Sequence, residues 1–395
     1  MGNRTGTPRR RWNGRAAMSR IAFPASSASF PTTWQDILKK AEGIDAVAYG
    51  HNRNYGDGSV TALSPYVSRG VISGRTILNI LVQKGVDVQR ITPFIQQLAW
   101  REYFQRVWQA KGDELLLDLK HSQDNAEFTD APDAVLNAHS DVDAIDAMVE
   151  RLVNTGYIHN HYRLYIASVI CNVARTHWKN PARWMYYHLL DADLASNTCS
   201  WQWVSGAFAS KKYRANQENI NRFSRTDQRN TWLDAAYEEL LLREIPPHFH
   251  SRTPQLYTTI LPESRITGID ESLPTCVYTF YNLDPLWHAS KPRNRVLLLE
   301  PSFFEAFPVC ERTMDFVLKL SANIPGIQVF VGEWKDLSDL SGRSELVFKE
   351  HPAFRHFRGT QEEREWLFPN VSGYFPSFFS YWKRCERELK KMATA

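Results

Sequence analysis

The stretch Asn154–Trp203, NTGYIHNHYRLYIASVICNVARTHWKNPARWMYYHLLDADLASNTCSWQW, decides the fold of this chain. Its Tyr162–Val173 part is almost wholly apolar, which is typical of a buried helix. Arg163 lies at the start of that helix and Asp191 and Asp193 follow it in the chain, and an unpaired buried charge costs several kcal/mol. We therefore expect Arg163 and the two aspartates, Asp191 and Asp193, to be mutual partners. Composition leaves two interpretations open, a structural ion pair in a helical core or a polar floor for a bound aromatic cofactor.

The motifs of this stretch resemble the flavin-binding core of the photolyase/cryptochrome family. The family signature is Gly-aromatic-x-His-Asn-x-x-Arg, then Trp, then Asp-x-Asp-Leu-Ala-x-Asn, then Trp-Gln-Trp, and each element occurs here in that order. Two upstream blocks, an SVTALSP loop and a WRE-aromatic helix, also match, so the resemblance covers roughly residues 25–240. It implies an all-helical domain that binds FAD.

Length and composition bound the remaining possibilities. A chain of 395 residues suggests two domains. The five Cys are scattered without a CxxC pair, which argues against a metal or iron–sulfur site and favours the cytoplasm. No apolar run reaches the length of a membrane span, so we expect no membrane partner, and we expect a monomer. The first twenty residues hold six Arg and no acid, and we expect them to form a basic disordered tail.

The second half of the chain changes its periodicity. CVYTFYN, RVLLLEP, IQVFVGEW and ELVFKEHP are short strand-like runs, with the helical CERTMDFVLKLSANI between the second and third. Alternating strands and helices predict a parallel α/β sheet. The closing VSGYFPSFFSYWKRCEREL resembles the end of the family's antenna domain, which comes first in ordinary relatives. The resemblance therefore implies a circular permutation, with an unidentified antenna chromophore possible.

The predicted fold class is multi-domain α and α/β, with an all-helical FAD-binding domain followed by a small parallel-sheet α/β domain. The predicted boundaries are a tail at 1–20, the helical domain at 21–240, a Pro-rich linker at 241–275 and the α/β domain at 276–395. Helices are expected at Phe30–Gly43 behind a Thr cap, at Pro93–Trp108, and at Ile145–Gly156 with Gly156 as its stop.

The resemblance assigns the cofactor contacts residue by residue. The SVTALSP loop leads into a helix whose free N–H groups favour an anion, and it matches the family's pyrophosphate loop. The residues implied to bind FAD are Tyr49, Arg53, Thr61, Leu63, Ser64, Phe94, Arg101, Asn160, Arg163, Asp191, Asp193 and Asn197.

The resemblance also implies an electron route to the flavin. Trp201 and Trp178 match the proximal and middle tryptophans of the family's chain, and Asn197 matches the residue beside flavin N5. The distal Trp is expected around Asn125, where none occurs, and Trp184 is a candidate substitute. The predicted catalytic residues are Trp201, Trp178, Asn197, Asn160 and Gln97.

The predicted lesion pocket departs from both repair classes of the family. Its expected residues are Trp100, Trp203, Gln97, Asn160, His161 and Leu164, with the two Trp rings stacking on an extruded base lesion. Cyclobutane-dimer enzymes usually place Glu where this chain has Gln97, and other side chains at His161 and Leu164. The 6-4 enzymes accept Gln at the first position but need His where this chain has Asn160. Downstream, Lys211–Arg229 is a basic segment, which is either a solvated face or a set of phosphate contacts.

Three functions remain open on these residues. The first is a light-driven, FAD-dependent deoxyribodipyrimidine photolyase, a lyase that repairs cyclobutane pyrimidine dimers in DNA by electron transfer from excited reduced flavin. The alternatives are a cryptochrome-like blue-light photoreceptor that signals to a partner protein without repair, or a 6-4 photolyase. The altered segment after Trp203 and the amide of Gln97 favour the receptor.

Overall fold

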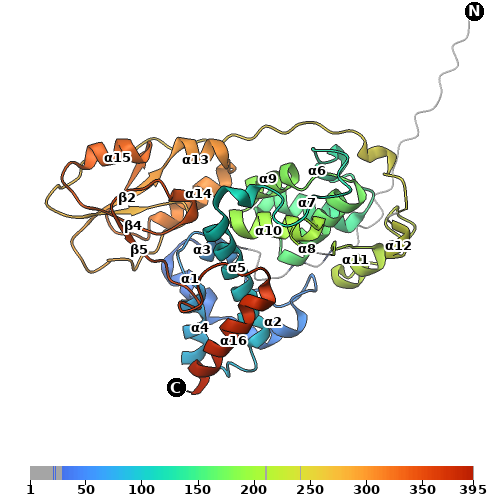
Figure 1. Cartoon of the computed structure of the whole chain (residues 1–395), viewed down its shortest axis with the longest axis horizontal. Coiled ribbons are helices and arrows are strands. Elements are labelled where there is room, and N and C mark those ends of the chain that lie inside the picture. Colours follow the sequence, from blue (N-terminus) through green and yellow to red (C-terminus); the bar gives the residue numbers. More distant parts are fainter. Residues whose placement is uncertain (1–20, 22, 24–28, 210, 241, 395) are drawn as a thin grey trace, which may run out of the picture.

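The computed structural model of the chain describes residues 21, 23, 29–209, 211–240 and 242–394. The predicted tail at 1–20 lies outside them. In the described part of the chain, helices lie between residues 34 and 240 and a parallel sheet lies in the remainder (Figure 1). The helices before the sheet are α1 (Trp34–Glu42), α2 (Ala46–Asn52), α3 (Ser64–Ser68), α4 (Gly74–Gln83), α5 (Thr92–Lys111), α6 (Asp133–Leu136), α7 (Asp143–Thr155), α8 (Asn160–Ser168), α9 (Lys179–His188), α10 (Leu194–Ser205), α11 (Gln217–Ser224) and α12 (Tyr237–Leu240).

The helix ends follow the capping residues of the sequence. The Thr33 side chain accepts the Asp36 N–H at the start of α1, and Pro93 occupies the first turn of α5. Gly156 ends α7 with a φ of 74°, a left-handed conformation that favours glycine. The predicted buried helix over Tyr162–Val173 is confirmed: α8 continues into a π-helical turn over Val169–Val173.

The sheet holds five parallel strands in the order β3-β2-β1-β4-β5. The strands are β1 (Thr275–Tyr278), β2 (Asn294–Leu299), β3 (Ile327–Val331), β4 (Leu346–Lys349) and β5 (Thr360–Glu362). The connecting helices are α13 (Pro301–Ala306) and α14 (Glu311–Ser321) between β2 and β3, and α15 (Trp334–Ser341) between β3 and β4. The strand order reverses between β1 and β4, and ligands of such sheets bind at the carboxyl ends of the strands beside that reversal.

The predicted α/β class is thus confirmed, and four of the five strands lie in the predicted runs. The prediction missed β5, which is a short edge strand of three polar residues with no apolar pattern. The described part of the Pro-rich linker runs without regular helix or strand from about residue 251 to β1, as an arc over the molecule (Figure 1). Arg252 fastens its start by donating to the carbonyls of Asp130 and Ala174 at 2.6 and 2.7 Å.

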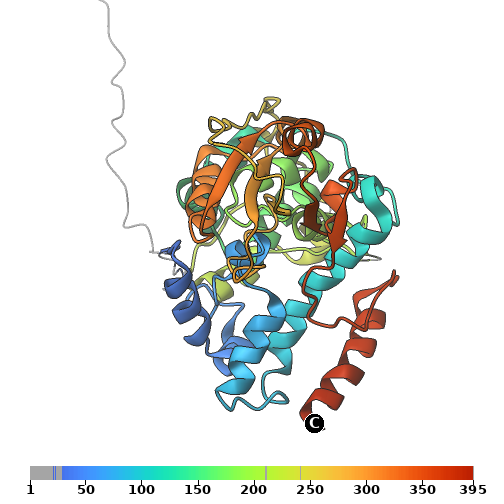
Figure 2. The same ribbon diagram turned by 90° about the vertical axis from the view of Figure 1, so that its left-hand side faces the viewer.

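The last helix, α16 (Phe378–Thr394), leaves the sheet and packs along α5 (Figures 1 and 2). The buried Glu102 carboxylate of α5 accepts the backbone N–H of Phe368 at 2.9 Å and the Tyr381 hydroxyl at 2.7 Å. Leu367 donates its backbone N–H to the same group. Burial raises the pKa of Glu102, although these donors and Arg106 act against the rise. The C-terminal segment is thus anchored to a helix almost three hundred residues earlier in the chain.

The apolar core is divided into two clusters. One joins α1–α5 to the sheet, its helices and α16, and the other fills the space among α6–α12. The loop between α9 and α10 lies where these clusters meet, since Leu190 and Ala192 belong to the first and Leu189 to the second. That loop carries the aspartates of the sequence signature.

Candidate cofactor site

Asp193 is the polar centre of the loop between α9 and α10. Asp193 is the N-cap of α10, and its carboxylate accepts the Ser196 N–H at 2.7 Å. Asp is a preferred N-cap residue because its side chain can accept such a backbone N–H. Arg101 of α5 forms an ion pair with the same carboxylate, and Gln105, one turn further along α5, donates to it at 3.0 Å. Burial would raise the pKa of Asp193, but Arg101, the Ser196 donor and nearby Arg69 outweigh it, and the pKa lies below its usual value.

Asp191 is held from the other side of the loop. Arg163 of α8 pairs with it at 2.9 Å and donates a second bond at 3.2 Å, a fork-like contact that fixes both side chains. The Arg163 Nε also donates to the Ile158 carbonyl at 2.9 Å. The predicted pair of Arg163 with Asp191 is therefore confirmed, whereas Asp193 takes its partner from α5.

Side chains outside the signature hold the backbone of this loop. The buried Arg69 donates to the Asp191 and Ala192 carbonyls at 2.9 and 3.0 Å, and its guanidinium lies 3.5 Å from the centre of the Phe280 ring. Tyr281, which follows β1, donates to the Ala192 carbonyl at 3.1 Å. Arg69, which follows α3, and Tyr281 of the α/β part thus hold the outer side of the loop whose inner side carries the two carboxylates.

A small cavity lies on that inner side. It measures about 40 Å³, room for a few water molecules, and its lining combines the two carboxylates with amide, hydroxyl, apolar and indole groups. The lining residues are Asn160, Arg163, Leu164, Ala167, Met185, Leu189, Asp191, Asp193, Ser196, Asn197, Ser200 and Trp201. This donor set suits a flat ring with a polar edge, and the lining side chains must move before a three-ring system can enter.

Seven of the sequence-predicted site residues are therefore brought together at one cavity. They are Asn160, Arg163, Leu164, Asp191, Asp193, Asn197 and Trp201. The side-chain NH2 of Asn197 donates to the Ala182 carbonyl of α9 at 2.8 Å. The amide oxygen of the same side chain is then the atom that can accept a hydrogen bond from a ligand.

The residues predicted for the rest of FAD gather around α2, α3 and α5. Tyr49 packs edge-on against Phe94 with ring centres 5.1 Å apart, and the Arg53 guanidinium lies 5.9 Å from the Tyr49 ring centre. The Thr61 hydroxyl accepts the Leu63 N–H at 3.3 Å, and Ser64 begins α3. The structure places this loop and Arg101 on neighbouring elements of one core cluster.

The predicted lesion-stacking rings each contact another aromatic side chain. Phe378 of α16 stacks on Trp100, with ring centres 3.6 Å apart and planes at 10°. Trp203 faces Tyr213 at 5.4 Å. The Tyr213 hydroxyl is 3.1 Å from the Nε2 of His161, the neighbour of Asn160.

Gln97 lies half-buried on α5, one turn before Arg101. A lesion stacked between Trp100 and Trp203 would have to compete with the Phe378 and Tyr213 rings.

The predicted electron-route residues lie in one apolar cluster. Trp178 and Trp201 are both almost fully buried there. Trp184 packs against His188 at 5.7 Å, and Asn125 donates to the Cys171 carbonyl at 3.3 Å.

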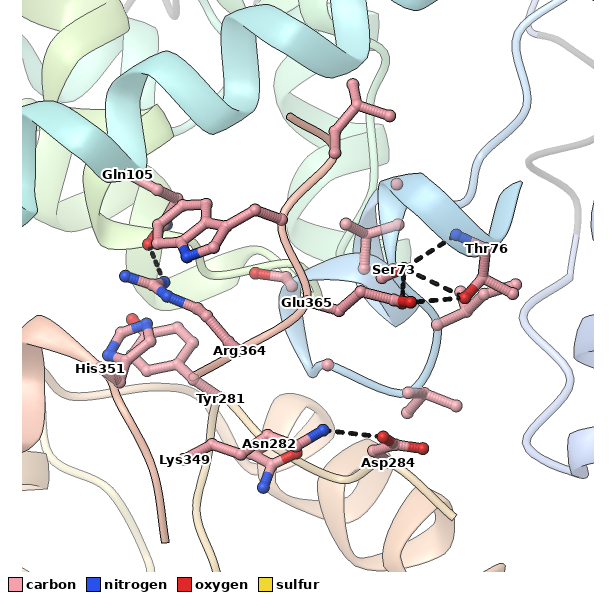
Figure 3. A pocket seen from close by; sticks show the side chains of 18 of the residues that line it. Ser73, Thr76, Gln105, Tyr281, Asn282, Asp284, Lys349, His351, Arg364 and Glu365 are labelled. Atoms are coloured by element: carbon pink, nitrogen blue, oxygen red, sulfur yellow. Dashed lines mark hydrogen bonds and ion pairs between the residues drawn. The ribbon is translucent and has the colours of Figure 1, made fainter. Parts of the chain in front are cut away.

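A second, larger cavity of about 500 Å³ shares Asp193 with the lining of the first. Figure 3 shows this second cavity from close by. It lies at the carboxyl ends of β1, β4 and β5 and is closed by α3, α4 and α5. Lys349 pairs with Asp284 at 2.8 Å along one side. Glu365 accepts from Ser73 and, at 3.0 Å, from Thr76 on another side.

Arg364 and His351 form the inner wall of this cavity. Arg364 pairs with Glu350 at 2.9 Å and donates to Gln105 at 2.7 Å, which links the cavity to the Asp193 centre (Figure 3). His351 stacks on Tyr281 with ring centres 4.3 Å apart, and burial lowers its pKa well below the usual range, so the ring is neutral at neutral pH. The buried Nη2 of Arg364 and Nδ2 of Asn282 have no hydrogen-bond partner.

Sequence reasoning missed Gln105, Arg69 and Tyr281. The first could have been found, because residues four apart lie on one face of a helix and Arg101 was already assigned. Arg69 and Tyr281 reach the loop across the fold, and no local pattern marks them.

Comparisons with known proteins agree with this geometry. A family profile described as the FAD binding domain of DNA photolyase matches residues 94–241. A deoxyribodipyrimidine photo-lyase of Alkalihalophilus pseudofirmus is 26% identical over 211 residues, covering 51% of this chain and 43% of that protein. One of Streptomyces griseus is 28% identical over 158 residues, covering 40% of this chain and 34% of that protein. The chain thus spans less than half of the length of these curated relatives.

Two solved structures resemble the chain more loosely. A cryptochrome of Synechocystis has a TM-score of 0.45 and 21% identity, covering 52% of this chain and 46% of that one. A class III photolyase of Agrobacterium tumefaciens has a TM-score of 0.40 and 22% identity, covering 48% and 44%.

The profile match and the relatives make residues 94–241 similar to the FAD-binding domain of DNA photolyases, and FAD is the cofactor that this match indicates. Among the described residues, no helix is long and apolar enough to cross a membrane. The same residues contain no group of three His, Cys, Asp or Glu side chains arranged for a metal ion.

Proposed function

We propose that this protein is a light-driven DNA photolyase that splits cyclobutane pyrimidine dimers. The observation that carries the proposal is the cavity between α8, α9 and α10, where the Arg163–Asp191 and Arg101–Asp193 pairs meet Asn197 and Trp201. It lies inside the segment that matches the photolyase FAD-binding domain.

Each side chain of the cavity has a definite task in this proposal. Bound FAD supplies the light absorption and the one-electron chemistry. Asp191 and Asp193 accept hydrogen bonds from the cofactor, and Asn197 offers an amide oxygen to the ring edge. Although burial raises the pKa of Asp193, Arg101 holds that pKa below its usual value. Trp201 stands at the ring as the first electron donor.

Basic side chains near the cavity would hold the DNA. Lys211, Arg222, Arg225 and Arg229 are exposed, and contacts of this kind to phosphate give sequence-independent binding that weakens as salt rises. An extruded lesion would then stack on Trp100 and Trp203, displacing Phe378 and Tyr213 from the faces that they cover.

The second candidate is a blue-light receptor with the same flavin core. The covered faces of Trp100 and Trp203 and the amide of Gln97 favour it, because they oppose the entry of a lesion and leave no carboxylate at that position. Light would then act through photoreduction and a partner protein.

Repair of a defined substrate separates the two functions. Reduced protein is mixed with an oligonucleotide that carries one thymine dimer, illuminated, and the dimer is quantified against a dark sample. We expect light-dependent loss of the dimer with turnover. Light-driven reduction of the bound flavin without any loss of the dimer would overturn the repair proposal in favour of the receptor.

We further propose that the α/β part of the chain is an antenna-type domain placed after the FAD domain, and that its 500 Å³ cavity holds a light-harvesting chromophore. Its position at the strand-order reversal and the two partnerless donors of Arg364 and Asn282 support this. An absorption band beyond those of flavin, lost in Asn282→Leu but kept in Leu340→Ala, an exposed position of α15 outside the cavity lining, is the expected result. A spectrum that flavin alone accounts for would contradict it.

A further inference from the structure

The indole of Trp178 is hydrogen-bonded to a carboxylate. Its Nε1–H donates to Asp118 Oδ1 at 2.6 Å. Asp118 lies in the loop after the 3-10 turn Gly112–Leu116. Trp178 is 1% exposed, whereas the Asp118 side chain keeps 22% of its surface in contact with solvent. The carboxylate therefore joins a buried, oxidisable ring to water.

Gln123 holds this pair in place. Its backbone N–H donates to the second oxygen of Asp118 at 3.2 Å, and its side-chain oxygen accepts the backbone N–H of Trp178 at 3.0 Å. The Gln123 amide nitrogen also donates to the Thr176 carbonyl at 2.8 Å. One buried side chain thus ties the loop of Asp118 to the segment that carries Trp178, so the short N–H···O contact is built into the fold.

Trp178 is also the outermost indole of its route. Among the described residues, its ring contact is with His177, at 5.6 Å and 34°. Trp184, the candidate substitute for the distal tryptophan, packs on His188 instead. Imidazole is harder to oxidise than indole, so the ring in contact with Trp178 is a poorer electron donor than Trp178 itself.

We propose that Asp118 is the proton acceptor that traps the oxidised Trp178, an inference that rests on the proposed flavin photochemistry. With photoexcited oxidised flavin bound, Trp201 would give up one electron, and Trp178 would return an electron to Trp201. The Nε1–H bond of the resulting Trp178 radical cation then breaks, and its proton bonds to Asp118 Oδ1. The products are a neutral Trp178 radical and a neutral carboxylic acid.

The contact distances suit this transfer. A base acts on a proton within hydrogen-bond reach, about 2.6–3.2 Å between heavy atoms, and the observed contact lies at the short end. His177 Nε2 lies 3.4 Å from the same Asp118 oxygen, beyond that reach, but the Asp118 side chain is 22% exposed and can release the proton directly to water. Loss of the proton makes the return of the electron to Trp178 unfavourable. Deprotonation would thus stabilise the separated charge in the way that electron transfer from a distal tryptophan otherwise would.

Flash photolysis of the FAD-loaded protein tests the assignment, because tryptophan cation and neutral radicals have different visible absorption bands. In the wild type we expect the cation band to convert to the neutral band, more slowly in D₂O. In Asp118→Asn the conversion should slow by about tenfold or more, and Asp118→Glu should restore part of it. Asp113→Asn, an exposed acid five residues earlier, is the matched control and should behave as the wild type.

A second readout needs no flavin. Ultraviolet resonance Raman spectra of the apoprotein report the strength of indole N–H hydrogen bonds, and the Trp178 band should shift in Asp118→Asn but not in Asp113→Asn. Equal conversion rates in wild type and Asp118→Asn would overturn the inference and leave the proposed function standing. Absence of any tryptophan radical in the illuminated wild type would overturn both.

Discussion

Replacing Asp193 with Asn separates the charge of this carboxylate from its role as a helix cap. Asn and Asp are comparable N-cap residues, so the acceptor for the Ser196 N–H remains and α10 loses little. Arg101, however, loses its ionic partner, and breaking a buried pair costs about 3–5 kcal/mol. The Arg101 side chain keeps 21% of its surface exposed, so water compensates part of this cost. We expect the free energy of unfolding to fall by about 2–3 kcal/mol.

Urea unfolding of the flavin-free protein, followed by circular dichroism, measures this loss. The control is Asp124→Asn, whose carboxylate pairs with Lys212 but is 79% exposed. A surface pair contributes about 1 kcal/mol or less, so the control should lie close to the wild type. If Asp193→Asn costs no more than Asp124→Asn, the reasoning that a buried ion pair holds the cofactor loop is refuted.

Three further predictions concern other parts of the chain. Burial, together with His161 and Arg163, lowers the pKa of His159 to about 3, so the unfolded chain binds a proton that the folded one excludes between about pH 3 and 6.5. The free energy of unfolding should therefore fall by up to about 1.4 kcal/mol per pH unit below pH 6.5. In His159→Phe the melting temperature should depend less on pH between pH 7 and 5 than in the wild type, and an unchanged dependence contradicts this. Trp100→Ala should weaken binding of dimer-containing DNA by about tenfold, since stacking on one base contributes about 1–3 kcal/mol; gel-shift titrations with equal affinity would disprove it. Glu102→Ala leaves backbone N–H groups at 367–368 without an acceptor and should cost about 2–3 kcal/mol. Limited proteolysis should then cut the 366–394 segment faster, and an unchanged cleavage rate counts against the anchor.

Local signals in the sequence predicted most of the fold. Thr33, Pro93 and Gly156 mark helix ends through backbone chemistry that needs no distant partner, and each lies where it was expected. The apolar runs of β1–β4 likewise predict a buried parallel sheet. Strand β5 was not predicted because its three polar residues carry no strand pattern, and its strand conformation depends on pairing with β4.

The site was predictable only where its residues belong to one motif. The pair of Arg163 with Asp191 follows from the need of buried charges for partners within a single helical core. The contact of Phe378 with Trp100 and the bond from Tyr281 to the loop join segments far apart in the chain. Such contacts depend on how the helical part packs against the α/β part and α16, and the hydrophobic periodicity of the sequence does not predict that packing.

The most direct test of the account is uptake of FAD by the purified protein. We predict one FAD per chain, with flavin fluorescence quenched by the neighbouring Trp201, and weaker uptake after Arg163→Leu, which removes the partner of Asp191. A colourless protein that binds no added FAD, or that binds it equally well after Arg163→Leu, would contradict the central claim.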